Sequence, residues 1–356
     1  MDLNQFIYKT FPQRVIFGSG TIQQLAHEIE ILGCSKALVL CTPEQVDQAK
    51  MVVQLLGDKS VGIFDQAIMH VPIETAHEAQ KLAQKLGADC AVAIGGGSTT
   101  GLGKAIALEF GLPIIAIPTT YAGSEMTPVY GLTENNLKRT GKDYRVLPKT
   151  VIYDPELTLS LPLHISVSSG INAIAHAAEG LYAQDGNPIM KLLAEEGIRA
   201  LAKGLKQLIN NDQDVQARSE CLYGAWLCGT VLGNVGMALH HKLCHTLGGT
   251  FNLPHAPTHA IVLPQAIAFN EQACPEITEI ICRALNVHNV SAGQALFDLN
   301  LILNAPIALK NLDFTENDIA KAAKIATSNP YWNPRKFNQE DIIHIIQDAY
   351  HGHRPQ

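Results

Sequence analysis

The sequence predicts two domains, an α/β nucleotide-binding domain over residues 1–160 and an all-helical domain over residues 161–356. In the first part, short apolar runs such as KALVLCT alternate with helical stretches such as IETAHEAQKLAQKLG. These runs lack polar alternation, which is typical of parallel strands that are covered by helices on both faces. After residue 160, long Ala- and Leu-rich stretches of helical period replace them, which indicates a second domain of another class.

The strands and helices of the first domain follow from these runs in order. The segment at residues 6–17 is interpreted as an edge strand that could exchange between subunits. The further strands expected along the chain are KALVLCT, KSVGIFD, ADCAVAIGG, LPIIAIPTT and KTVIYDP. The first intervening helix has Pro near its first turn and the second ends in Gly, both of which are common at those positions. This order predicts a doubly wound sheet.

The second domain is expected to contain helices and almost no strands. The stretches that carry the helical period are ISVSSGINAIAHAAEGLYAQ, PIMKLLAEEGIRALAKGLKQLI, residues 215–249 and QEDIIHIIQDAYHG. The sequence contains no repeat and no flexible linker, so the two domains are expected to pack tightly with a cleft between them.

Composition excludes several classes of function. The 356 residues carry a net charge of −7 with no basic run, which argues against nucleic acid as a partner. The sequence holds no apolar run of membrane-spanning length, and its first ten residues do not resemble a signal peptide. The eight cysteines form no CxxC pair and are expected to be buried and reduced, Cys244 included, so a soluble cytoplasmic protein is predicted.

A glycine loop stands between a predicted strand and a helix. It comprises Gly95, Gly96, Gly97 and Ser98, where glycines allow close approach of the backbone and the helix start attracts anions. Thr119 and Thr120 follow the next strand along the chain. Because the carboxyl ends of parallel strands meet at one edge of a sheet, these residues are predicted to bind a nucleotide cofactor.

The choice between NADH and NADPH depends on the residues that follow the second strand of such a fold. There the sequence offers Thr42 and Glu44 with no adjacent Arg or Lys. Glu44 would repel a 2′-phosphate, so NADH is the predicted cofactor and NADPH is the alternative.

Residues 239–260 hold five of the fourteen histidines. His241 and His245 are one helical turn apart, and His255 comes from a segment beyond two glycines and a proline. Two ligands on a helix and one from a returning segment is a common way to build a metal site. A catalytic site and a set of core or surface histidines are the other readings of this pattern.

In order along the chain, the segments GGGSTTGLGKA, PTTYAGSEMTP, VIYDPELTLSLP, GINAIAHAAEGLYA and HHKLCHTLGG…LPHAP resemble the iron-containing alcohol dehydrogenase family. Within that family they are most similar to the maleylacetate reductase branch, and the likeness runs from residue 14 to residue 335. The resemblance implies a dehydroquinate-synthase-like fold, an NAD(P)H site in the cleft and a homodimer. It also implies that the glycine loop holds the pyrophosphate, while Thr119 and Thr120 lie at the nicotinamide side.

The resemblance further implies individual residue roles. Lys138 matches a lysine near the cofactor ribose, although a solvated loop charge is an equal reading. The positions of the family's metal ligands are occupied by Asn172, His176, His241 and His255, and His245 matches a histidine that faces the substrate. His240 and His259 match no ligand position and are predicted to lie at the surface.

Asn172 stands where a metal-dependent member of the family has Asp. An amide offers no negative charge to a divalent ion, so the set is interpreted as vestigial and a metal is not expected to be required. Gly101 and Gly103 also depart from the wider family, which usually has Asp and Ala there.

The resemblance then implies reduction of maleylacetate, a 4-oxo-2-enedioate, to 3-oxoadipate in the degradation of aromatic compounds such as hydroxyquinol, chlorocatechol or resorcinol. His241 and His245 are the predicted catalytic residues, which would stabilise and protonate an enolate. Further candidates to bind the dicarboxylate are Lys142, Arg145 and Arg335. The alternatives are a metal-dependent alcohol or glycerol dehydrogenase and, more remotely, a non-catalytic NAD-binding protein.

Overall fold

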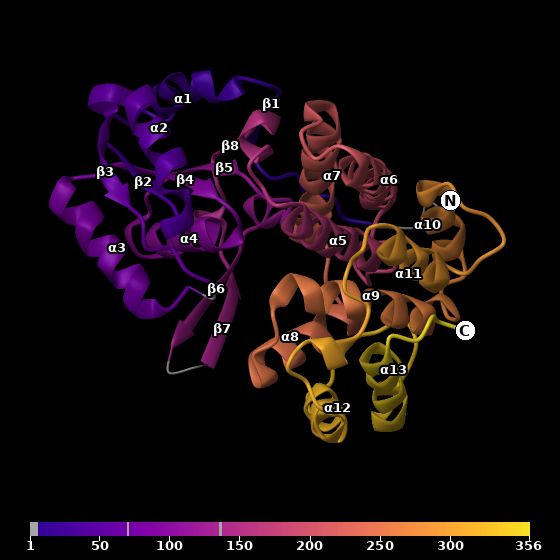
Figure 1. The fold of residues 1–356 in the computed structure, drawn as a ribbon. Helices are drawn as coiled ribbons and strands as arrows, with labels where there is room; N and C mark the ends of the chain where they lie inside the picture. Colours follow the sequence, from indigo (N-terminus) through magenta and orange to yellow (C-terminus); the bar gives the residue numbers. More distant parts are fainter. Residues whose placement is uncertain (1–5, 70, 135–136) are drawn as a thin grey trace. The chain divides into compact units, whose positions relative to one another are not determined.

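The computed structural model describes residues 6–69, 71–134 and 137–356 (Figure 1). The chain divides into two compact units. One is the α/β unit, Thr10–Leu161, and the other is the helical unit, Pro162–Gln356, with which residues 6–9 are grouped. This division falls beside the predicted boundary after residue 160.

Six parallel strands form the sheet of the α/β unit, in the order β1-β8-β5-β4-β2-β3. The four inner strands are buried along their whole length, which explains why their sequences show no polar alternation. The strands are β1 (Arg14–Phe17), β2 (Ala37–Leu40), β3 (Ser60–Phe64), β4 (Cys90–Gly95), β5 (Ile114–Pro118) and β8 (Thr150–Tyr153).

Helices cover both faces of this sheet, as Figure 1 shows. Val39 of β2 packs with α1 (Leu25–Ile31) and α2 (Val46–Leu56). Its neighbours in the strand, Leu38 and Leu40, pack on the other face with α3 (Ile73–Leu86) and α4 (Gly97–Phe110). Successive side chains of a strand point to opposite faces, so two apolar cores require strands that are apolar throughout.

Two features of the α/β unit differ from the sequence-based expectation. In the predicted edge strand at residues 6–17, only Arg14–Phe17 forms a strand, which pairs with β8 at the sheet edge. A separate antiparallel hairpin of β6 (Val129–Glu134) and β7 (Leu137–Lys142) was not predicted. Lys138 belongs to β7, and its side chain lies outside the described part of the chain.

The helical unit contains helices and short 3-10 turns. Residues 162–356 are all described and include no strand. Its α-helices are α5 (Leu163–Gly180), α6 (Pro188–Asn210), α7 (Val215–Asn234), α8 (Leu239–Phe251), α9 (His255–Glu271), α10 (Glu276–Leu285), α11 (Ala292–Ile302), α12 (Ile319–Thr327) and α13 (Gln339–His351).

The helical stretch predicted over residues 215–249 is broken in the structure. Helix α7 ends at Asn234, and α8 begins at Leu239 after a bend of 95°. Between them, the backbone N–H of Gly236 donates to the Asp185 carboxylate at 2.8 Å, so these residues leave the helical hydrogen-bond ladder. Within the described residues, no single helix is long and apolar enough to span a membrane, and α7 with α8 reaches that length and composition only across the bend.

Candidate functional site

The carboxyl edge of the sheet gathers the predicted nucleotide-binding residues of the α/β unit. Strands β2, β4 and β5 are neighbours, and each is followed directly by candidate residues. Thr42 and Glu44 follow β2, the glycine loop follows β4, and Thr119 and Thr120 follow β5. The arrangement matches the edge at which doubly wound sheets bind ligands.

The structure constrains the three glycines of the loop differently. Gly95 has a φ of 150°, and a Cβ there would lie 2.5 Å from Gln45 Oε1 and from Thr99 Oγ1. At Gly96 a Cβ would lie 2.9 Å from Thr120 Cγ2, so these two glycines serve the packing of the loop itself. At Gly97, however, the nearest described atom would be 3.8 Å away. Gly97 is exposed at the start of α4, so an anionic group can approach its backbone.

Gln45 is a residue of this edge that the sequence did not single out. Its Nε2 donates to Thr119 Oγ1 at 2.7 Å, and its Oε1 accepts from Thr42 Oγ1 at 3.3 Å. Gln45 therefore links the residues after β2 to those after β5, across Gly95. Glu44, two residues after Thr42, is exposed, and the hydrogen bond from Thr42 lowers the pKa of its carboxyl.

Lys104 of α4 is a second residue that the sequence did not single out. It is only 2% exposed, and its Nζ donates to Ser124 O and Val129 O at 2.7 Å and to Thr127 Oγ1 at 3.0 Å. Burial lowers the pKa of Lys104 to about 7, while the nearby Glu125 opposes that shift. These hydrogen bonds connect α4 to the segment at residues 124–129, which follows β5 and Thr120.

Six histidines form a cluster in the helical unit, which we call the histidine cluster. Ring centroids are 5.1 Å apart for His176 and His241, 5.0 Å for His241 and His259, 4.3 Å for His255 and His259 and 6.2 Å for His241 and His245. The structure thus brings together the four histidines that the resemblance singled out. The members are His176 on α5, His240, His241 and His245 on α8, and His255 and His259 on α9.

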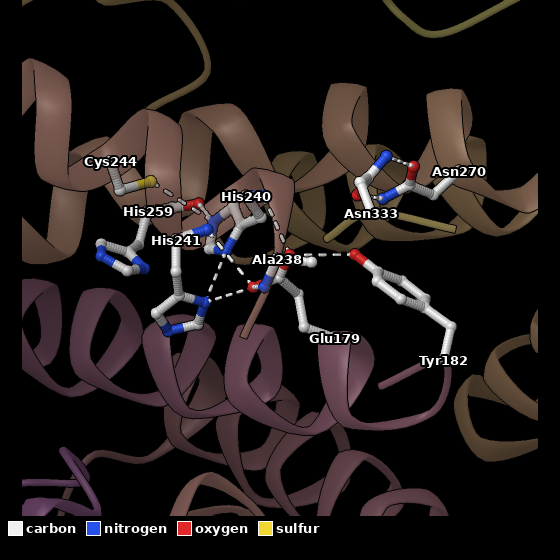
Figure 2. A network of polar contacts seen from close by, with 9 residues as sticks. All are labelled: Glu179, Tyr182, Ala238, His240, His241, Cys244, His259, Asn270 and Asn333. Atoms are coloured by element: carbon white, nitrogen blue, oxygen red, sulfur yellow. Dashed lines mark hydrogen bonds and ion pairs between the residues drawn. The ribbon is translucent and has the colours of Figure 1, made fainter. Parts of the chain in front are cut away.

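The prediction that His240 and His259 lie at the surface is wrong, because both are fully buried. His240 Nε2 lies 3.1 Å from the backbone oxygen of His259, and the two rings pack edge to face (Figure 2). One ring nitrogen from each of His240, His241 and His259 lies within 4.8 Å of the others. Sequence position alone could not place them here, since neither matches a ligand position of the family.

Burial controls the charge of the cluster. It is the largest cause that holds the pKa values of His176, His241 and His259 well below the usual histidine value, and neighbouring histidines add to it. Burial also lowers the pKa of His240 to about 3, again with a contribution from His241. These four rings are therefore neutral, and each ring presents one N–H and one lone pair.

Glu179 is the main residue of the site that the sequence analysis missed. It is fully buried on α5, and its Oε2 lies 2.6 Å from His241 Nδ1 (Figure 2). A signal was present, because Glu179 stands in the apolar stretch AHAAEGLYA, and a buried charge requires partners. Because a carboxylate can only accept, Nδ1 of His241 carries the proton that is donated to Glu179, and in the neutral ring Nε2 carries the lone pair.

The residues at the family's metal-ligand positions offer neutral atoms to a divalent ion. Asn172 is 5% exposed, and among the described residues its Oδ1 has no hydrogen-bond partner, nor have His176 Nδ1 and His241 Nε2. These atoms could accept hydrogen bonds from a small polar molecule or coordinate an ion. All three are neutral, however, while the Glu179 carboxylate faces Nδ1 of His241. The set therefore supplies ligand atoms but no negative charge to offset a dication.

Two of the predicted substrate-binding cations are engaged elsewhere. Arg145 pairs with Asp143, with an Nη2–Oδ2 distance of 2.7 Å. The Arg335 guanidinium lies 3.9 Å above the Phe269 ring and donates to the Phe269 carbonyl at 3.1 Å. Neither contact points to a role in binding a carboxylate.

Comparisons with known proteins agree with this architecture. Residues 12–155 match the model of iron-containing alcohol dehydrogenase, and residues 166–350 match the C-terminal model of the Fe-containing alcohol dehydrogenase family. A maleylacetate reductase from Burkholderia cepacia is 58% identical over 99% of this chain and 100% of its own, and one from Sphingobium indicum is 53% identical over 99% of both. The crystal structure of maleylacetate reductase from Agrobacterium tumefaciens is 49% identical, with a TM-score of 0.95 over 99% of this chain and 100% of that one. The chain belongs to the iron-containing alcohol dehydrogenase family.

Proposed function

We propose that this protein is an oxidoreductase that reduces the carbon–carbon double bond of maleylacetate with NAD(P)H, giving 3-oxoadipate in the degradation of aromatic compounds. The observation that carries the proposal is similarity over nearly the whole chain to several enzymes named maleylacetate reductase, at 49–58% identity. The ligand atoms of Asn172, His176 and His241 also support this reaction, because they offer no negative charge to a dication.

The chemistry requires hydrogen-bond donors that stabilise negative charge on the enolate oxygen, and a source of one proton. Hydride from the cofactor adds to the carbon β to the ketone, and the electron pair of the double bond moves toward the ketone oxygen as an enolate. A proton then joins the α carbon, so that substrate, NAD(P)H and one proton give product and NAD(P)⁺. Each well-placed hydrogen-bond donor to the enolate oxygen contributes about 3 kcal/mol.

The geometry divides the roles of the two predicted catalytic histidines. His241 is neutral and donates Nδ1–H to Glu179, so its Nε2 can only accept a hydrogen bond. His245 stands one turn further along α8, with its ring 6.2 Å from that of His241, and it is exposed. We therefore assign the proton-donor role to His245. Because Nε2 of His241 can only accept a hydrogen bond, we assign His241 no donation to the enolate oxygen, in contrast to the role predicted from the sequence; its lone pair would instead orient a hydrogen-bond donor at the site.

We also propose that turnover does not depend on a resident metal. An enolate delocalises its charge and needs a Lewis acid less than the localised alkoxide of an alcohol dehydrogenase does. The amide at Asn172 removes the one negative charge that the family's ligand positions would offer a dication.

The cofactor proposal rests on the carboxyl edge of the sheet. Ser98 and the open backbone at Gly97 would face the pyrophosphate, Thr119 and Thr120 the nicotinamide side, and Thr42 and Glu44 the ribose. NADH is preferred because the exposed Glu44 carboxylate would repel a 2′-phosphate. The ribose contact of Lys138 and a cytoplasmic homodimer stay predictions of the family resemblance.

The test is NADH oxidation by the purified protein with maleylacetate, with the product identified by mass spectrometry. We expect 3-oxoadipate, and we expect the rate to survive a strong chelator while metal analysis shows less than stoichiometric iron and zinc. Oxidation of glycerol or simple alcohols that is lost on chelation would instead support the metal-dependent dehydrogenase. No turnover of either substrate class would support a non-catalytic protein.

His245→Ala tests the assignment of the proton donor. We expect kcat to fall about a hundredfold, the usual scale for losing a positioned acid. His288→Ala is the matched control, since His288 is an exposed histidine of the same unit in the loop after α10. An unchanged kcat in His245→Ala would remove His245 from the mechanism.

A further inference from the structure

The start of α8 is held by a side chain from another helix. The first N–H groups of a helix lack partners within it and need an acceptor. The N-cap residue here is Ala238, whose side chain has no oxygen to offer. Glu179 of α5 supplies the acceptor, because its carboxylate receives the backbone N–H groups of Ala238 at 3.1 Å, His240 at 2.9 Å and His241 at 3.3 Å.

The same carboxylate has two further partners. It accepts from His241 Nδ1 at 2.6 Å and from the Tyr182 hydroxyl at 3.1 Å (Figure 2). Within the described part of the chain, these five contacts all come from groups that can donate. A carboxylate can accept from all of them at once, whereas a glutamine would turn its NH₂ group toward at least one donor. The contacts therefore select an acid at position 179.

These contacts also fix the ring of His241. The backbone N–H and the Nδ1 of His241 both meet Oε2 of Glu179, so the residue is held at two points. With its proton on Nδ1, the ring turns the Nε2 lone pair away from Glu179. Carboxylates that orient an active-site imidazole in this way set its tautomer and raise its basicity.

We propose that Glu179 is a positioning residue that fixes the tautomer and orientation of His241, in addition to capping α8. The kinetic part of this inference rests on the proposed function, but the tautomer does not. A purely structural cap would stabilise α8 equally well without determining which nitrogen of His241 carries the proton. The experiment must therefore separate these two effects.

The first measurement is the ¹⁵N spectrum of the wild-type protein with labelled histidine, in which the His241 signals are assigned by comparison with His241→Gln. We expect a Nδ1–H tautomer with a strongly deshielded proton, as suits a 2.6 Å contact with a carboxylate. A wild-type His241 with its proton on Nε2 would overturn the proposal, whatever the activity, and this result needs no variant at position 179 to fold.

The second measurement compares Glu179→Gln with Tyr182→Phe. In Glu179→Gln we expect His241 to lose the single Nδ1–H tautomer and kcat for maleylacetate to fall 10- to 100-fold, the usual cost of losing such a partner, while the Kd for NADH stays within about twofold. Tyr182→Phe removes one contact of the same carboxylate and spares His241, so it should keep both the tautomer and kcat within about twofold.

The outcomes separate the two proposals. A wild-type protein that shows the Nδ1–H tautomer but does not turn over maleylacetate would refute the proposed function and support the positioning of His241. A Glu179→Gln protein that folds but keeps both the tautomer and kcat would show that Glu179 is only a helix cap. If Tyr182→Phe lost the Nδ1–H tautomer as completely as Glu179→Gln does, the tautomer would not depend specifically on the contact between Glu179 and His241.

Discussion

Gly97→Ala should weaken the affinity of the protein for NADH without lowering its stability. Gly97 is the first residue of α4, and a Cβ there would lie 3.8 Å from Ser124 Oγ and 3.9 Å from Ala122 Cβ. The folded protein can therefore accommodate the added methyl group without moving a neighbour. In the proposed cofactor site, a phosphate oxygen would approach the backbone of Gly97 through the same space.

The two magnitudes follow from different physical effects. Alanine is about 0.5–1 kcal/mol better than glycine in a helix, so the free energy of unfolding should rise slightly or stay constant. The methyl group should displace the pyrophosphate from one backbone N–H. Losing one hydrogen bond to a charged group costs about 1.5–3 kcal/mol, which corresponds to a 10- to 100-fold weaker Kd for NADH.

The assay pairs thermal or denaturant unfolding with NADH titration followed by fluorescence. Gly103→Ala is the matched control, because Gly103 lies further along the same helix and a Cβ there would make ordinary contacts of 3.5 Å with Ala93 and Ile114. This control should gain similar stability and keep its affinity for NADH. Unchanged affinity in Gly97→Ala, with stability as expected, would refute the placement of the pyrophosphate at Gly97.

Three further substitutions test the cofactor choice, the metal status and the buried lysine. Glu44→Arg should raise kcat/KM with NADPH, and an unmoved preference would show that Glu44 does not face the ribose. Asn172→Asp should tighten iron or zinc binding, measured by metal content after dialysis, because it adds charge beside His176 and His241; equal metal content in both proteins would contradict this. The pKa of Lys104 is about 7 in the fold, whereas an unfolded lysine keeps its proton to a higher pH. Between about pH 7 and 10 the unfolded state therefore binds more protons than the folded state, and the free energy of unfolding should rise with pH. Lys104→Met should lack this contribution, and identical pH slopes would show that Lys104 stays charged in the fold.

Much of the α/β unit could be predicted because its rules are local. Strands buried on both faces must be apolar throughout, and β2 shows the consequence, since Val39 packs on one face while Leu38 and Leu40 pack on the other. The glycine loop could be located for a similar reason, as it joins a strand to a helix in a short stretch. The β6–β7 hairpin was not predicted, because its runs are short and polar and lack a strong strand pattern.

The parts that could not be predicted depend on contacts between distant residues. The break between α7 and α8 relies on Glu179 and Asp185, which lie more than fifty residues before the backbone groups that they hold. A window of sequence around residue 238 shows apolar helical residues and no capping side chain. The burial of His240 and His259 has the same origin, because it is created by the packing of α8 against α9.

Asn172 also affects whether this site favours a metal ion or a substrate oxygen. An aspartate at this position could only accept hydrogen bonds, and its charge would repel a negatively charged oxygen. The amide of Asn172 can instead turn its NH₂ group toward such an oxygen, and neutral His176 can present an N–H beside it. Both side chains are buried, and among the described residues Asn172 Oδ1 and His176 Nδ1 lack partners, so one polar atom of each is not committed to a contact within the fold. A site made of groups that can both donate and accept suits an enolate oxygen, which gains charge during the reaction, better than a permanent dication, which needs a fixed acceptor. Under the proposed function, the amide in place of a carboxylate at residue 172 would favour binding of the substrate oxygen over binding of a metal ion at this site.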